Sequence, residues 1–303
     1  MNDMRTSPFL LRFRNRWRGL FALAIAGWAG VSGCGKWEEA QVPHWIVVPV
    51  PEVVVEAGEG TANARIEEVW VYTETRVLGA FPLPARIPVL PAEEGENVTL
   101  TFLPGIRANG VAATRKPYPF YEAFRQSFGL REGTTDTLTW STGYVEGAFV
   151  QVAEDFENAN RFVAGSTSTA EMVRTTAPEW VREGVGSGLC ILDDSHPVLY
   201  AMTNEQQYAL PDDGAVWMEF EARGDIHFAI GIAAFTPAGV QRVPILIVAP
   251  TDGEWKKFYL DLGPVVRSVN NALWWEITLD AALEPGATGG RFALDNLKLV
   301  GYP

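Results

Sequence analysis

The residues of this chain best suited to binding chemistry are aromatic side chains that alternate with apolar ones. Trp217 lies between apolar residues of the segment 215–223, and Tyr259 lies between those of 258–262. Because successive side chains of a strand point to opposite faces, both rings are expected on the polar face. There an aromatic ring can stack on a sugar, or it can pack beneath a loop, as most tryptophans do. Trp274 and Trp180 complete this set of candidate ligand-binding residues.

Catalytic residues are sparse, since the histidines are His44, His196 and His227 alone. The segment 193–197 gathers acid, serine and histidine, but adjacent residues rarely reach the geometry of a triad, so it is interpreted as a turn. The chain has no G-x-S-x-G motif, no zinc-spaced Cys/His cluster and no phosphate-binding glycine loop. We therefore predict that the protein is not an enzyme. A hydrolase with two carboxylates stays an alternative, because spatial pairs are invisible in sequence.

The elements that must position these residues are short strands. Alternation over 215–223, 228–233 and 258–262 predicts half-buried strands, and no stretch has a long helical period. The apolar phase slips at Asp295-Asn296, which predicts a β-bulge. Many strands without a long helix indicate an all-β chain with a sandwich or jelly roll.

The first half of the chain has the same character. Runs at 68–72 and 98–102 predict strands, whereas Pro104-Gly105 and Asn109-Gly110 predict turns. Residues 122–129 are expected to form a short helix. Pro49 and Pro51 favour an edge strand or a linker near residues 41–55.

Two resemblances refine this fold prediction. The first half of the chain resembles a short β-sandwich module of Gram-negative surface lipoproteins. The residues that carry this resemblance are Val69–Tyr72, Leu78–Phe81, Pro88–Leu90 and Leu103–Ile106 with Asn109-Gly110. The second half resembles the β-jelly-roll modules of the carbohydrate-binding, galactose-binding-like class. This resemblance is carried by Asp155-Phe156-Glu157, the segment 255–262 and the segment 294–299. The first resemblance implies an architecture and no reaction.

The jelly-roll resemblance also implies a structural Ca²⁺ held by Asp155, Glu157 and Asp295. Ca²⁺ takes six to eight oxygen ligands, which carboxylates and backbone carbonyls supply. The alternative is that these acids are solvated turn residues.

The N-terminus carries five arginines, then the uncharged segment 19–30, then Val31-Ser32-Gly33-Cys34. This order resembles a bacterial lipoprotein signal peptide with its lipobox. The uncharged run is shorter than the roughly 20 residues that span a bilayer. The resemblance implies cleavage before Cys34, a lipid on its sulfur and anchorage to a membrane. The segment 36–39 resembles a surface-export signal, with Trp37 interrupting it, so the expected location is the outer membrane, facing the cell surface.

The net charge and the cysteine content limit which partners the protein can have. Residues 1–33 carry a net charge of +4, so a chain starting at Cys34 would carry −17 rather than −13. An acidic chain repels phosphate backbones, which argues against nucleic acid as a partner. Once Cys34 is lipidated, Cys190 has no disulfide partner, and its apolar surroundings predict a buried thiol.

The predicted organisation is a signal peptide (1–33), a linker with a first strand (34–65), a small β-sandwich (66–125), a linker (126–145) and a jelly roll (146–303). The leading hypothesis is a membrane-anchored binding or adhesion protein that holds a glycan or another cell-surface component. The alternatives are a structural or assembly lipoprotein of the envelope and a polysaccharide hydrolase.

Overall fold

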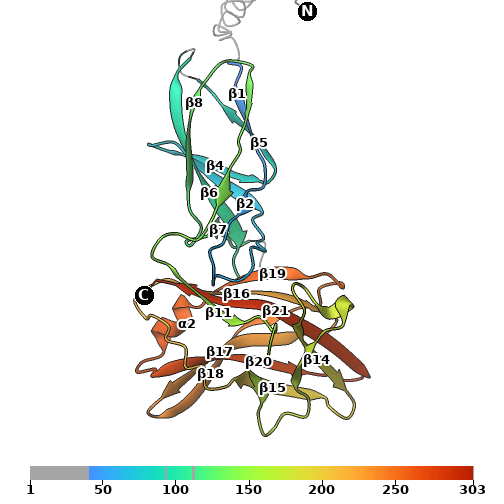
Figure 1. Cartoon of the computed structure of the whole chain (residues 1–303). Coiled ribbons are helices and arrows are strands. Elements are labelled where there is room, and N and C mark those ends of the chain that lie inside the picture. Colours follow the sequence, from blue (N-terminus) through green and yellow to red (C-terminus); the bar gives the residue numbers. More distant parts are fainter. Residues whose placement is uncertain (1–40, 92, 94, 111–112, 303) are drawn as a thin grey trace, which may run out of the picture. The chain divides into compact units, whose positions relative to one another are not determined.

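The computed structural model describes residues 41–91, 93, 95–110 and 113–302. The predicted lipobox with Cys34 and the charged segment after it lie outside these residues. From Pro43 onward the chain forms one compact unit, built almost entirely of strands (Figure 1). Among the described residues, none of the helices combines the length and the apolar character needed to cross a membrane.

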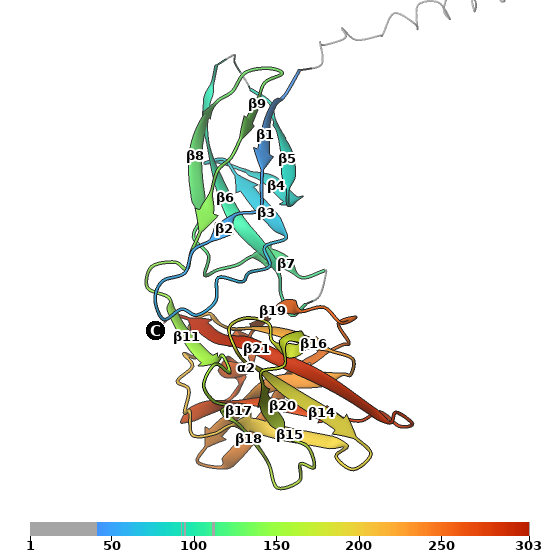
Figure 2. The same ribbon diagram turned by 45° about the vertical axis from the view of Figure 1, so that its right-hand side comes forward.

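The N-terminal module, residues 43–145, is a small β-sandwich (Figure 2). One sheet has the order β5–β1–β9, made of Ala85–Val89, His44–Val48 and Thr135–Thr137. The other contains β4 (Val77–Pro82), β3 (Glu68–Tyr72), β6 (Asn97–Arg107), β7 (Arg115–Pro117) and β8 (Phe124–Gly129), with both β7 and β8 paired to β6. Strands β2 (Glu52–Val53) and β10 (Ser141–Thr142) form a separate pair.

The core of this module lies between its two larger sheets. The alternate residues Ile46 and Val48 of β1 face Val69 and Val71 of β3, and all four are fully buried within one hydrophobic cluster. Strand β1 pairs on both sides, with β5 and β9, so it is a central strand and not the predicted edge strand or linker. This is possible because β1 ends before the first of the two prolines.

Three other expectations for this module differ from the structure. Residues 124–129 form strand β8 rather than a helix, because Phe124 and Phe128 pack inward at a period of two. Pro104-Gly105 lies inside β6, not in a turn, although Asn109-Gly110 does turn the chain with positive φ angles. The segment 34–65, expected to hold a linker and a first strand, holds both β1 and β2, and the expected linker 126–145 holds β9 and β10, so the module extends beyond residues 66–125.

The second module is a β-jelly roll made of two facing sheets. The six-stranded sheet has the order β13–β14–β21–β16–β19, with β11 also paired to β21. Its strands are β11 (Phe149–Glu154), β13 (Met172–Thr175), β14 (Ser187–Asp193), β16 (Val216–Gly224), β19 (Lys256–Asp261) and β21 (Gly289–Gly301). A 3₁₀ turn, η1 (Pro178–Trp180), and the short helix α2 (Gly263–Ser268) lie in its loops.

The five-stranded sheet has the order β12–β15–β20–β17–β18. Its strands are β12 (Phe162–Ala164), β15 (Val198–Thr203), β20 (Trp274–Ala282), β17 (Phe228–Thr236) and β18 (Gly239–Val248). Between the two sheets, Phe228 of β17 stacks on Phe292 of β21 with ring centroids 4.1 Å apart. The predicted fold class, a small β-sandwich followed by a jelly roll, is confirmed.

The predicted strand phases in this module are also confirmed. Val216, Met218 and Phe220 enter the core, as do the alternate residues of β17 and β19. Glu219 pairs with Lys298 while Glu221 pairs with Asp295, so Asn296 and Leu297 together stand opposite one residue of β16. Asn296 has a φ of 51°, and this is the predicted bulge.

Candidate functional site

Two of the predicted stacking residues, Trp217 on β16 and Tyr259 on β19, lie on the outer face of the six-stranded sheet. They are only 1% and 2% exposed, because the N-terminal module covers them. Tyr118 packs edge-on against Trp217 with ring centroids 5.3 Å apart, and its ring lies 5.1 Å from that of Tyr259. The expectation that these two rings stand on an open face is therefore wrong. Alternation within a strand reports which face a side chain occupies, not what covers that face.

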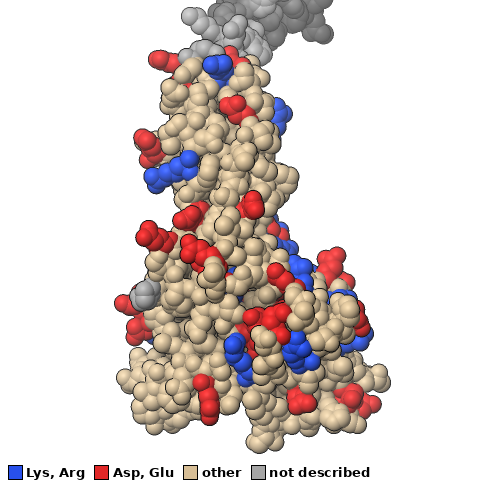
Figure 3. All heavy atoms as spheres, viewed as in Figure 1, with Lys and Arg blue, Asp and Glu red and all other residues tan. Residues whose placement is uncertain are grey.

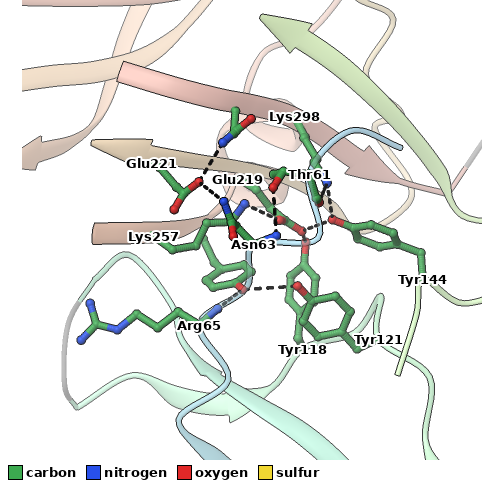
Figure 4. A network of polar contacts seen from close by, with 12 residues as sticks. Thr61, Asn63, Arg65, Tyr118, Tyr121, Tyr144, Glu219, Glu221, Lys257 and Lys298 are labelled. Carbon is green, nitrogen blue, oxygen red and sulfur yellow. Dashed lines mark hydrogen bonds and ion pairs between the residues drawn. The ribbon is translucent and has the colours of Figure 1, made fainter. Parts of the chain in front are cut away.

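Beneath this aromatic layer lies a buried carboxylate, Glu219 of β16 (Figure 4). Its Oε1 accepts hydrogen bonds from the hydroxyls of Tyr118 (2.7 Å) and Tyr144 (3.1 Å). Its Oε2 lies 3.1 Å from the Nζ of Lys257. A buried carboxylate requires such donors, because an unpaired charge away from water is strongly unfavourable.

The segment 61–65 runs along the same network and ties it to the N-terminal module (Figure 4). The carbonyl of Thr61 accepts a 2.6 Å hydrogen bond from the buried ammonium of Lys298. The amide of Arg65 donates to the hydroxyl of Tyr259 at 2.9 Å. Between them, the side chain of Asn63 donates to Glu183 at 2.8 Å. The backbone of one module therefore satisfies buried polar groups of the other, and its Asn63 side chain adds a hydrogen bond to an exposed carboxylate.

The electrostatics of this junction are those of a water-poor interior. Burial, reinforced by the negative charge of Glu219, raises the pKa values of Tyr118, Tyr144 and Tyr259. Burial lowers the pKa of Lys298 to about 8. The phenols therefore remain protonated donors at neutral pH. Because Glu219 is 0% exposed, it contacts no solvent, and the arrangement joins the two modules.

The outer face of the five-stranded sheet is the second place where predicted residues lie, and here part of the face is open. Trp274 of β20 and Phe235 of β17 are paired neighbours whose rings stack 5.0 Å apart. Both are half-buried. Tyr200 of β15 is 45% exposed. It pairs with Asp280 of β20, which lies two residues along that strand from the buried Thr278. Aromatic side chains thus border this face at two ends.

Between these aromatic residues the floor of the face is made of small side chains. Gly231 and Ala233 of β17 stand beside Thr278 and Glu276 of β20, and all four are buried. A Cβ atom on Gly231 would lie 2.2 Å from a backbone oxygen, so only glycine fits there. Glu276 is held by the hydroxyl of Thr203 at 2.5 Å and by a backbone amide.

Arg242 of the edge strand β18 crosses this floor. Its guanidinium donates to the carboxylate of Asp280 on β20 (2.5 Å) and to the carbonyl of Ala201 on β15 (3.2 Å). In a flat sheet β18 and β15 would be roughly 14 Å apart, three spacings of about 4.8 Å. An arginine side chain is shorter than this, so the sheet curls toward its outer face. Arg242, Asp280, Tyr200, Trp274 and Phe235 define what we call the open sheet face.

Trp180, the fourth predicted ligand-binding residue, is 8% exposed at the end of η1. The guanidinium groups of Arg223 and Arg291 lie 4.9 Å and 4.7 Å from its ring centroid. The ring also packs against Trp255 and Leu189. Its faces are therefore occupied by protein, and it is separate from the open sheet face.

The three predicted calcium ligands make other contacts. Asp295 is 1% exposed and accepts hydrogen bonds from the hydroxyl of Ser187 (2.6 Å) and from the amide of Asn296 (2.8 Å). Burial raises its pKa to about 7. Asp155 accepts the amide of Glu157, and Glu157 accepts the amide of Val185, both at 3.1 Å. Across the described ranges, no group of three or more His, Cys, Asp or Glu side chains is placed to hold a metal ion.

The segment 193–197, interpreted from the sequence as a turn, forms a turn in the structure. The amide of His196 donates to the carbonyl of Asp193, and the Asp193 carboxylate accepts the amides of Ser195 and His196. These hydrogen bonds lower the pKa of Asp193. Cys190 is fully buried, as predicted, and burial raises the pKa of its thiol to about 12.

Comparison with known proteins places carbohydrate-binding modules among the structural neighbours. The family 11 module of a cellulosomal cellulase of Clostridium thermocellum aligns with 50% of this chain and 95% of its own, at 12% identity and a TM-score of 0.36. The family 30 module of another cellulosomal cellulase of the same organism aligns with 50% and 96%, at 10% identity and a TM-score of 0.38. A third, from the β-sandwich superfamily of carbohydrate-binding modules, aligns with 77% and 84%, at 14% identity and a TM-score of 0.34. No protein-family model and no curated protein matches the chain.

Several residues of the buried junction around Glu219 and of the open sheet face were not predicted from the sequence. Glu219 was on the polar face of its strand by alternation, but its burial depends on Tyr118 and Tyr144, which lie 101 and 75 positions away. Arg242 and Asp280 are 38 positions apart, and no local spacing pairs them. Phe235 carried a detectable signal, because it continues the phase of the small residues Ala229, Gly231 and Ala233, opposite to the large apolar residues that enter the core.

Proposed function

We propose that this protein is a membrane-anchored, surface-exposed lipoprotein that binds a glycan on the open sheet face of its jelly roll. The observation that carries the proposal is the arrangement of this face. The Trp274–Phe235 stack and the exposed Tyr200 border a floor of small residues, and the Arg242–Asp280 pair lies across it.

The chemistry of a sugar fits this arrangement. A pyranose ring offers C–H groups to an aromatic surface and hydroxyls that both donate and accept hydrogen bonds. Aromatic side chains supply the apolar contact, and a few placed polar groups fix orientation, which is the common composition of ligand sites. Arg242 supplies donors and Asp280 supplies acceptors. The outer face of the other sheet offers no such site where the N-terminal module covers Trp217 and Tyr259.

A glycan array probed with the purified protein tests this proposal, followed by titration calorimetry on the sugars that bind. Trp274→Ala is expected to weaken binding by about 10-fold or more, since truncating an aromatic side chain that anchors a ligand costs about 2 kcal/mol or more, and about 1.4 kcal/mol is tenfold. Arg242→Gln is expected to weaken it as well. Trp45→Ala is the matched control, because Trp45 is a half-buried tryptophan of β1 with the Arg86 guanidinium 4.1 Å from its ring.

The control variant should bind like the wild type. A blank array would overturn glycan binding and leave a structural or assembly role in the envelope as the better hypothesis. Equal affinity in the wild type and in Trp274→Ala would overturn the assignment of the open sheet face.

The membrane anchor in this proposal depends on Cys34, with the arginine-rich segment and the apolar run before it. Two acyl chains hold a protein stably on a membrane, whereas one holds it only marginally. Cys34→Ser is expected to abolish labelling by radioactive palmitate and to release the protein from the membrane fraction. Protease treatment of intact cells tests surface exposure, since a protein facing the periplasm would be protected.

A structural Ca²⁺ at Asp155, Glu157 and Asp295 stays a prediction. Melting temperatures of the purified protein in calcium and in a chelator test it. A rise in calcium that is lost in Asp155→Asn would support the site, and identical melting temperatures would remove it.

A further inference from the structure

We propose a second saccharide site, on the outer face of the five-stranded sheet of the N-terminal module. A groove of about 510 Å³ lies over β3, β6 and β8, which pair side by side (Figure 2). It is lined by Tyr72, Thr73, Glu74, Thr99, Thr101, Leu103, Ala123 and Arg125. Its volume falls within the roughly 300–1,000 Å³ of ordinary ligand pockets.

The strand register explains why these side chains meet. Phe102 and Phe124 point into the core, so the residues one position away point out to this groove. Thr101 pairs with Tyr72 on one side and with Arg125 on the other. One row across the sheet therefore presents a phenol ring, a hydroxyl and a guanidinium in succession.

Neighbouring rows extend this surface. Thr99 exchanges a 2.8 Å hydrogen bond with Ser127 on β8, which adds two hydroxyls. The groove also continues around the turn at residues 73–76. There a second hollow of about 440 Å³ shares Thr73, Glu74 and Thr99 with the first.

The polar groups of this groove are available to a ligand. Within the described part of the chain, the side chains of Tyr72, Glu74 and Arg125 make no hydrogen bond or ion pair. Glu74 and Arg125 are exposed and Tyr72 is half-buried. Most of the arginine side chains that the structure describes differ in this respect. Arg65, Arg107, Arg182 and Arg242, for example, each pair with a carboxylate.

The composition of the lining selects a neutral, hydroxyl-rich ligand. One arginine and one glutamate give the groove no net charge, so neither an anion nor a cation is attracted by the whole lining. Threonine hydroxyls beside Tyr72 disfavour a purely apolar segment, because its burial would leave them unpaired. A neutral oligosaccharide uses the ring for stacking and the threonine, arginine and glutamate groups for its hydroxyls.

Most of the molecular face in Figure 3 is likewise uncharged, and its acidic and basic side chains are intermingled there. A site on each module would let one chain hold two parts of the same glycan. Linking two weak sites in this way raises overall avidity without any new contact. The groove shares no lining residue with the open sheet face, so variants of one site leave the other unchanged.

The test uses the purified full chain and a panel of neutral hexasaccharides of glucose, mannose, galactose and xylose, with a hexauronate as the charged probe. Two variants address the groove, Tyr72→Ala and Arg125→Gln, and Thr101→Val removes one hydroxyl at constant shape. Arg131→Gln is the matched control, an exposed arginine of the same module outside the groove. Melting temperatures identify any variant that fails to fold.

We expect Trp274→Ala protein to retain binding of a neutral hexasaccharide, and Tyr72→Ala in that background to weaken it at least 10-fold. Loss of all binding in Trp274→Ala, with no effect of Tyr72→Ala, would overturn the second site and leave the jelly-roll site standing. The reverse pattern would support the second site and overturn the jelly-roll site. Preference for the hexauronate, or no binding by wild-type protein, would overturn the inference.

Discussion

Tyr118 of the N-terminal module donates a 2.7 Å hydrogen bond to Glu219 of the jelly roll, and both side chains are 2% exposed or less. A carboxylate buried this deeply is tolerated only with several donors. Two of its three partners, Tyr118 and Tyr144, come from outside the jelly roll, and the third is Lys257. The jelly roll therefore depends on its neighbour to satisfy its own buried charge. A face that alternation assigned to a ligand serves instead as an internal interface.

Removing the Tyr118 hydroxyl tests this dependence. Tyr118→Phe keeps the ring packing against Trp217 but leaves Glu219 with one phenol donor fewer. We expect the free energy of unfolding to fall by about 1.5–3 kcal/mol, the usual contribution of a hydrogen bond to a charged group. Urea unfolding measures it, with Tyr200→Phe as the control because Tyr200 is 45% exposed. Equal losses in the two variants would contradict a special role for the buried bond.

The ion pair between Lys257 and Glu219 should show strong coupling. Lys257→Met leaves Glu219 buried without its cation, and breaking a buried pair in this way costs about 3–5 kcal/mol. Glu219→Gln with Lys257→Met removes both charges, so the double variant should be more stable than the sum of the two single effects predicts. Urea unfolding of all four proteins gives the coupling energy. Simple additivity would show that the two groups do not interact.

The sequence was sufficient for strands β16, β17 and β19 of the jelly roll because each of them carries its own period-2 signal. Val216, Met218 and Phe220 identify the inward face of β16 without reference to any other strand, and the phase slip at Asp295-Asn296 identifies the bulge. The helix expected at 122–129 failed for the opposite reason. Only pairing with β6 turns Phe124 and Phe128 inward, and that pairing is a tertiary event.

The candidate sites were less predictable than the strands. The aromatic character of Trp274 was visible in the sequence, but its neighbour Phe235 is determined by the register of β17 against β20. Trp217 and Tyr259 carried the same signal as Trp274 and are buried. Exposure is a property of the assembled chain, because it depends on which distant segment covers a face. Local alternation therefore cannot separate a stacking platform from an interface.

Cys190 offers a direct measure of how rarely the jelly roll opens. Its thiol is 0% exposed and burial raises its pKa to about 12, so little thiolate forms at neutral pH. We expect a Cys34→Ser protein to react with Ellman's reagent only in denaturant, releasing one equivalent of thiolate chromophore. Rapid reaction in buffer would show that β14 opens readily, which its place between β13 and β21 argues against.

Asp295 should make stability depend on pH between about 4 and 7. An unfolded aspartate has a pKa near 3.9, and burial raises the pKa of Asp295 to about 7 in the folded protein. Between these values the folded protein retains a proton that the unfolded chain has released. The free energy of unfolding therefore falls as pH rises through this window, by up to about 1.4 kcal/mol per pH unit from this group. Urea unfolding at intervals from pH 4.5 to 8 measures the slope.

Asp295→Asn is the variant that isolates this effect, since it mimics the protonated side chain. The amide retains an acceptor for the Asn296 backbone and a donor that can reach the Ser187 hydroxyl. We expect the variant to lose the downward slope and to exceed the wild type in stability at pH 8. Asp193→Asn is the control: hydrogen bonds lower the pKa of Asp193, so its contribution is lost only as pH falls below about 4. It should keep the wild-type slope, and an unchanged slope in Asp295→Asn would show that Asp295 is ionised throughout this range.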